Sequence, residues 1–285
     1  MKKLIFLVSI SMFLTVLGLR TNAQVLEGPP RDGIYDRTTT SQIDPIPYCY
    51  IREADVIWSR RIWRVLDMRE KMNQPFYYPI KETHGWKSFI TILLDAMREG
   101  TITAYSPADD QFQIPITYKE LMDKLRVKQK VTLSRPDNPD EKFDTVIEKD
   151  FYPEDVKKIR IKEDWVFDRQ RSVQEVRILG ICPMIDNVDP NTGEIRGETP
   201  IFWVYFPECR PLLAKNEQFN LKNGVAGRLT YDDVFMKRMF ASYIFKEENV
   251  YDRRIDEYES GVGALLEAEK AKQNLFEFEQ NVWEY

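Results

Sequence analysis

Residues 45–79, PIPYCYIREADVIWSRRIWRVLDMREKMNQPFYYP, are the stretch around which we interpret the rest of the chain. Prolines at both ends favour an extended backbone, because a proline fixes its own φ and disfavours helix in the residue before it. Between them, apolar residues recur at three- and four-residue spacing, the period of one helix face. They are Ala54, Trp58, Ile62, Val65, Leu66 and Met72. This spacing predicts a helix from about Arg52 to Asn73, whose two tryptophans anchor the core.

Three arginines in this stretch, Arg60, Arg61 and Arg64, lie largely off the apolar stripe. One interpretation is that they form the solvated side of a buried scaffold helix. The other is that they meet an acidic partner, since Arg and Trp are over-represented where interfaces bind most strongly. The stretch carries no catalytic motif, so it indicates either scaffold or interface.

The first residues have the pattern of a secretory signal peptide. Lys2 and Lys3 are positive, residues 4–19 are apolar, and Ala23 ends the segment on a small residue. The apolar run of roughly 16 residues is shorter than the ~20 that span a bilayer. We therefore expect residues 1–23 to be removed on export. No cysteine follows the run directly, so we do not expect a lipid anchor on this chain.

The composition is that of a folded, acidic protein. Hydrophobic residues make up 43% of the chain, aromatic residues make up 13%, and the formal net charge is −5. A disordered chain has fewer apolar residues. Binding to nucleic acid needs a basic footprint, which this balance does not provide, so we expect no nucleic-acid partner.

The rest of the chain predicts an α+β fold, in which antiparallel strands and hairpins pack with several helices. We expect an extended arm at 24–50, a core domain at 51–248 and a helical tail at 249–285. The expected helices of the core after the anchor helix are about 83–100, 118–126 and 230–246, with capping boxes at Thr117 and Thr230. The expected strands are 127–133, 143–148, about 159–167, 172–185 and 200–206.

The tail carries a narrow apolar stripe at alternating spacings of four and three residues, the seam of a coiled-coil face. Its members are Ala264, Ala268, Ala271, Leu275, Phe278 and Val282. Such a stripe must be buried against something. Docking on the chain's own domain and docking on another chain are both open.

The three cysteines are Cys49, Cys182 and Cys209. In an oxidising compartment one pair could form, and Cys182 with Cys209 is the better pair because the two flank a predicted hairpin. The alternative is three small buried thiols.

The sequence gives little support for catalysis or for a cofactor. His84 is the only histidine, and no serine lies in a nucleophile-elbow context. The 186–194 loop offers Asp186, Asp189, Asn191 and Glu194 as oxygen ligands, but its spacing does not match an EF-hand and is also ordinary turn chemistry. We expect no enzyme and no cofactor; a periplasmic hydrolase and a small-ligand or calcium-binding protein are the alternatives.

Residues 52–79 closely resemble the GldN/PorN family of the type IX secretion and gliding-motility apparatus. The PIPY entry at 45–48 and the segment YDDVFMKRMF at 231–240 are also similar to that family. The resemblance looks closest to the PorN branch. It implies a non-enzymatic structural subunit, and the family has no catalytic motif from which a residue role could be carried over.

The resemblance further implies a location and partners. Such a subunit lies in the periplasm and is associated with the outer membrane through a GldK/PorK-like lipoprotein. With this lipoprotein and neighbouring copies it forms a large ring, linked to GldL/PorL-like and GldM/PorM-like components of the trans-envelope motor. A closed ring needs two different faces on each subunit. We expect the arm (24–50) and the tail (263–285) to supply part of these contacts.

Overall fold

The stretch predicted to form the anchor helix is instead a β-strand. The computed structural model describes residues 42–83, 85–134, 142–149, 151–188, 195–219 and 228–282, all within one unit spanning residues 37–285. Strand β1 (Val56–Asp67) pairs antiparallel with β6 (Val156–Asp168) along almost its whole length, and with the shorter β10 (Tyr243–Glu247) on its other side. The prediction of a helix at 52–73 was therefore wrong. Within 52–73 the only helical part is the 3₁₀ turn η2 (Glu53–Asp55), and the short helix α2 (Gln74–Tyr77) begins just after this stretch.

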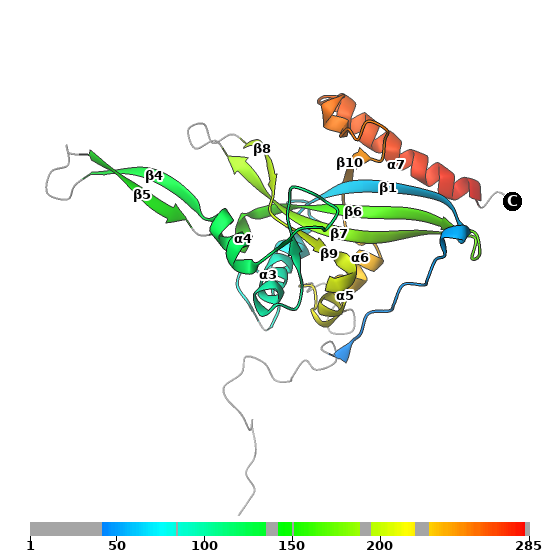
Figure 1. Ribbon diagram of the computed structural model, residues 1–285, viewed down its shortest axis with the longest axis horizontal. Coiled ribbons are helices and arrows are strands. Elements are labelled where there is room, and N and C mark those ends of the chain that lie inside the picture. Colours follow the sequence, from blue (N-terminus) through cyan, green and yellow to red (C-terminus); the bar gives the residue numbers. More distant parts are fainter. Residues whose placement is uncertain are drawn as a thin grey trace, which may run out of the picture. The chain divides into compact units, whose positions relative to one another are not determined.

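Eight strands of the described chain form one antiparallel sheet in the order β10-β1-β6-β7-β9-β2-β3, and β8 also pairs with β7 (Figure 1). The remaining strands are β7 (Val173–Val188), β8 (Ile195–Pro200), β9 (Trp203–Tyr205), β2 (Ala104–Tyr105) and β3 (Pro115–Ile116). The predicted strands at 159–167 and 172–185 are confirmed as the long central pair. The segment predicted at 200–206 divides into the end of β8 and all of β9, and both pair with β7.

A separate two-stranded sheet is formed by β4 (Val127–Ser134) and β5 (Lys142–Lys149). It projects away from the larger sheet (Figure 1). The first strand was predicted from its alternating pattern and the second as its returning partner, and the structure confirms both.

Local capping signals set the boundaries of several helices. Helix α3 (Phe89–Glu99) begins after Ser88, whose side chain accepts a hydrogen bond from the Thr91 amide, and ends at Gly100 with φ 75°. Helix α4 (Tyr118–Leu125) has the predicted capping box of Thr117 and Glu120. Helix α5 (Phe206–Lys215) follows β9 directly.

Helix α6 (Tyr231–Met236) has its predicted capping box at Thr230 and Asp233 but is much shorter than expected. The prediction that it continues to about residue 246 was wrong. The backbone at Arg238 has φ 52°, in the left-handed region that interrupts a helix, and residues 243–247 form β10. The apolar residues beyond 236 therefore pack from a strand and a turn.

The main core lies between the sheet and helices α3, α5 and α6. Its centre is a group of buried rings whose centroids are 5.3–5.9 Å apart, formed by Phe76, Phe89, Tyr231 and Phe235. Buried residues of the sheet, such as Ile159, Ile161 and Ile181, complete it. The fold is therefore α+β, as predicted.

The predicted C-terminal helix is present as α7 (Val262–Val282), which follows the 3₁₀ turn η4 (Ile255–Glu257). It lies beside the β10–β1 side of the sheet, away from α3, α5 and α6 (Figure 1). Another 3₁₀ turn, η3 (Pro153–Asp155), precedes β6. Among the described residues, no helix has the length and apolarity that crossing a membrane requires.

Candidate interaction surfaces

The three arginines proposed as an interface are all engaged within the fold. Arg60 Nη1 lies 2.5 Å from Glu247 Oε1 on β10. Arg61 donates two hydrogen bonds to Asp164 on β6, at 2.6 and 2.9 Å. Arg64 Nε donates to Glu163 Oε2 at 3.1 Å. These contacts tie β1 to both neighbouring strands.

Glu163 is the centre of a buried charge cluster. Its side chain is completely buried and receives hydrogen bonds from Arg64, from Trp165 Nε1 at 3.1 Å and from Arg238 Nη2 at 3.1 Å. Burial lowers the pKa of the Arg64 guanidinium, while the charge of Glu163 acts in the opposite direction. The cluster joins β1, β6 and the turn after α6, and a buried charge that lost its partner would be strongly destabilising.

The apolar stripe of the tail packs on the chain's own sheet. Ala268, Ala271 and Leu275 are buried together with residues of β1, β10 and η4. Ala264 packs at the edge of this cluster, and the Phe278 ring stacks on Trp58 with centroids 4.3 Å apart. Val282 is partly exposed at the end of the helix. The sequence left open whether the stripe docks on its own domain or on another chain. In the structure it docks on its own domain.

The candidate pair Cys182 and Cys209 is not bonded in the structure. Cys182 and Cys209 are free thiols in different clusters: Cys182 packs with Trp63 and Trp203, whereas Cys209 lies in the main core. Burial raises the pKa of the Cys182 thiol to about 12 and also raises the pKa of Cys209. Cys49 is exposed and free.

Most of the 186–194 loop, considered as an alternative calcium site and including Asp189, Asn191 and Glu194, lies outside the described residues, as does His84. Asp186 is described and lies on β7. Within the described ranges, no group of three or more His, Cys, Asp or Glu side chains could hold a metal ion.

The end of the predicted arm docks on the fold through Tyr48. The Tyr48 ring lies below two guanidinium groups, with its centroid 5.0 Å from Arg177 Cζ and 4.4 Å from Arg210 Cζ. Its hydroxyl donates to Met236 Sδ at 3.4 Å, and burial raises its pKa. Arg210 is itself held by two hydrogen bonds to Asp232, at 2.9 and 3.1 Å. Residues 24–41 of the arm lie outside the described residues.

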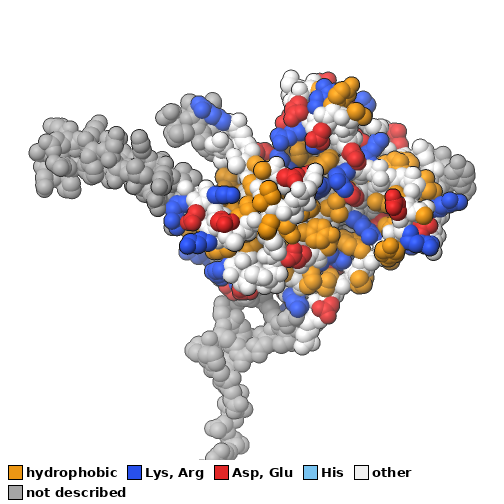
Figure 2. Space-filling model, in the orientation of Figure 1, with side chains coloured by type: hydrophobic (Ala, Val, Ile, Leu, Met, Phe, Trp, Pro, Cys, Tyr) orange, Lys and Arg blue, Asp and Glu red, His pale blue; other side chains and the backbone are white. Residues whose placement is uncertain are grey.

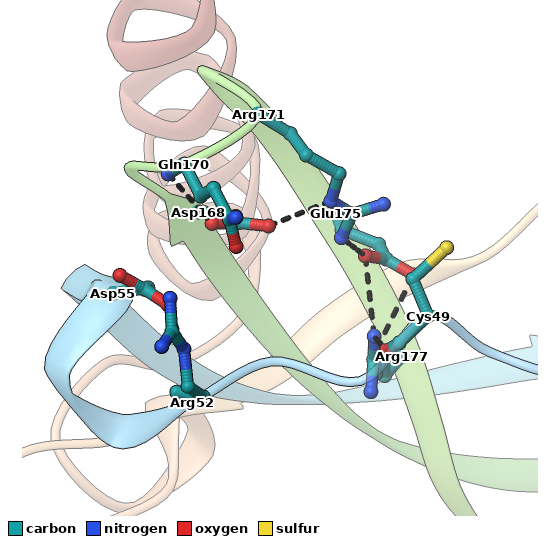
Figure 3. Close-up of polar contacts among 8 residues, drawn as sticks. All are labelled: Cys49, Arg52, Asp55, Asp168, Gln170, Arg171, Glu175 and Arg177. Atoms are coloured by element: carbon teal, nitrogen blue, oxygen red, sulfur yellow. Dashed lines mark hydrogen bonds and ion pairs between the residues drawn. The ribbon is translucent and has the colours of Figure 1, made fainter.

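A chain of polar contacts continues from this segment to the β6–β7 turn (Figure 3). Arg177 donates to the Cys49 carbonyl oxygen and to Glu175. Arg171 lies between two carboxylates, with its Nε 2.6 Å from Asp168 Oδ2 and its Nη2 2.6 Å from Glu175 Oε2. The sequence did not indicate this network, because its members are distributed over three segments of the chain.

A second feature that the sequence did not indicate is an exposed apolar surface at the start of α7, which we call the η4–α7 patch. Its members are Val250, Tyr251, Tyr258, Val262, Leu265 and Leu266. Val250 is 98% exposed and Val262 is 72% exposed. Figure 2 shows hydrophobic side chains on the surface at the top, over the beginning of α7. Exposed apolar patches commonly mark sites of protein–protein interaction.

Residues 51–284 match the family model described as "Gliding motility associated protein GldN". A comparison with curated proteins finds none that matches the chain. The match spans most of the sequence, including the whole sheet, all the described helices and the η4–α7 patch. The chain therefore belongs to the GldN family, the PorN-like component of the gliding-motility and type IX secretion apparatus.

Proposed function

We propose that this protein is a non-enzymatic structural subunit of the type IX secretion and gliding-motility machinery. It is exported to the periplasm by its N-terminal signal peptide. There it assembles with a GldK/PorK-like outer-membrane lipoprotein and with neighbouring copies into a large ring, which contacts the GldM/PorM-like and GldL/PorL-like motor components. The observation that carries the proposal is the family match over residues 51–284.

The surface of the described chain supports a role in assembly. The η4–α7 patch offers three exposed aliphatic side chains on one helix, Val262, Leu265 and Leu266. Burying one such side chain is worth about 1.5–3 kcal/mol, so the patch could supply much of the apolar centre of an interface. The α7 stripe packs on the chain's own sheet, whereas the side chains at the start of the helix stay exposed and can meet a partner.

The proposal is tested by purifying a tagged full-length chain from gently solubilised cell envelopes. We expect a large particle that contains the lipoprotein, with a ring visible by electron microscopy. An unrelated exported protein with the same tag is the control for carry-over. A small species without the lipoprotein would contradict the proposal.

A further inference from the structure

A cavity of about 500 Å³ lies between α7, η4, β8 and the strands β10, β1 and β6. Its wall is mixed: apolar side chains alternate with the charged residues Arg160, Glu198, Arg254 and Asp256, and the apolar part includes Val65, Tyr243, Ile244, Ile255, Ala264 and Leu265. Its volume is within the range of pockets that hold small molecules. The cavity is separate from the buried Glu163 cluster and borders the η4–α7 patch only at Leu265.

One cation in this wall, Arg160, has no carboxylate partner in the part of the chain that the structure describes. The Nε atom of Arg160 is buried and makes no hydrogen bond, and Arg160 forms no ion pair with any described residue. Its guanidinium carbon lies 4.5 Å from the centroid of the Phe245 ring. Strand pairing sets Arg160 opposite Val65, which is opposite Tyr243, so the three form one row across the sheet and share a face. A guanidinium presents a planar fork of donors that matches a carboxylate, and here that fork is unused.

The other charged groups around the cavity do not supply the missing anion. Glu198 is bonded to Lys158. Asp256 forms no ion pair with an arginine in the described part of the chain, whereas Arg254 adds a second positive charge to the wall. Burial is the largest influence and lowers the pKa of Arg160; the charge of Arg254 also lowers this pKa, whereas Cys182 and Glu198 act in the opposite direction. Burying a cation without a counter-ion costs folding free energy. The fold nevertheless keeps the half-buried guanidinium of Arg160 beside the cavity.

We propose that this cavity binds a carboxylate carried on an apolar body. The carboxylate pairs with the guanidinium of Arg160, with Arg254 at the rim, and the body packs against Val65, Tyr243 and the residues of α7. The apolar wall disfavours a small inorganic anion, which would gain nothing from it. A free aliphatic acid and the C-terminal residue of a polypeptide share this chemistry. The proposal does not depend on ring assembly.

The test measures the melting temperature and the binding isotherm of the full chain with two carboxylates. Hexanoate represents a free aliphatic acid, and N-acetyl-leucine represents the end of a polypeptide. Hexanamide and N-acetyl-leucinamide are matched controls that lack the charge, and inorganic phosphate is the control that lacks the apolar body. We expect a saturable rise in melting temperature with a carboxylate and none with the controls. The acid that binds more tightly identifies the source.

Substitutions then assign the binding to the cavity. Arg160→Met should weaken carboxylate binding about 10- to 100-fold, as expected for loss of a charged hydrogen bond. The same variant should keep or raise the melting temperature without ligand, because Arg160 has no ion pair to lose. Arg61→Met, which removes an arginine that does have a carboxylate partner, should keep full binding. Ala264→Phe, which fills the cavity from α7, should reduce binding by a second route.

Three results would overturn the proposal. One is the absence of binding and of any rise in melting temperature with either carboxylate at about 10 mM. This concentration exceeds the Kd of even weak specific binding. Another is a response of equal size with the amides or with phosphate. The third is unchanged binding in both Arg160→Met and Ala264→Phe. Each of these is distinguishable from a failure of ring assembly, because all are measured on the isolated chain.

Discussion

At the scale of single residues, Asp168 is the clearest link between a local contact and stability. Its carboxylate, at the end of β6, accepts hydrogen bonds from Arg171 Nε at 2.6 Å and from the Gln170 amide at 2.9 Å (Figure 3). The bond from Arg171, followed by that from the Gln170 amide, holds the pKa of Asp168 below its ordinary value. An unfolded aspartate titrates near pH 3.9, so folding favours the ionised form.

We therefore predict that Asp168→Asn lowers the stability of the protein at pH 7. The contribution of a carboxylate with a lowered pKa is present above the unfolded pKa and is lost as the pH falls through the folded pKa. The difference in unfolding free energy between wild type and variant should accordingly shrink as the pH falls below about 5 and through the lowered pKa of Asp168. Urea unfolding of both proteins at several pH values measures this difference in unfolding free energy. Asp123 is exposed on α4, so Asp123→Asn is the control and should leave stability at pH 7 unchanged. A stability difference between wild type and Asp168→Asn that did not depend on pH would contradict this account.

The buried charges show what residue-level reasoning could not foresee. Arg64 was interpreted as a solvated residue because it lies off the apolar stripe, yet it is 6% exposed and bonded to Glu163, 99 positions away in sequence. Arg61 is bonded to Asp164 in the same way. No local pattern announces a partner on a distant strand. For the same reason the contact of Tyr48 with Arg177 and Arg210 could not be predicted from PIPY alone.

At the scale of elements, the packing of α7 is decided by its apolar stripe. Leu275 is 3% exposed, whereas its neighbour Phe276 is 64% exposed. We predict that Leu275→Ala destabilises the isolated chain by about 2–5 kcal/mol, the usual cost of removing a buried leucine side chain. Phe276→Ala should change stability by no more than about 0.5 kcal/mol. Chemical unfolding compares the two, and equal small effects would show that the stripe is not docked on its own sheet in solution.

The elements that the sequence predicted correctly are those with local signals. The capping boxes at Thr117 and Thr230 and the stop at Gly100 each lie where a helix begins or ends. β1 was mistaken for a helix because both of its alternating rows mix apolar residues with arginines, which conceals the period of two. Its Val, Ile and Trp content favoured a strand. What fixes that state is pairing with β6 and β10, which are remote in sequence.

At the scale of the whole molecule, helix α7 has one face that packs on the sheet and a separate exposed apolar start. The α7 face that carries Ala268, Ala271 and Leu275 holds the helix to the sheet, while the side chains at its start remain exposed. A subunit that assembles head-to-tail needs such a surface in addition to the contacts that fold it. The η4–α7 patch meets this requirement without unfolding any element of the chain.

We therefore predict that the double substitution Val262→Glu and Leu266→Glu abolishes co-purification of the proposed lipoprotein partner and leaves the chain folded. Both side chains are mostly exposed and neither lines the Arg160 cavity, so folding and carboxylate binding should be kept. Two buried charges would oppose the desolvation of an interface. Phe276→Glu, on the same helix but outside the patch, is the matched control and should assemble normally. If the double variant still forms the full assembly, the patch is not the contact surface and the interface lies elsewhere on the subunit.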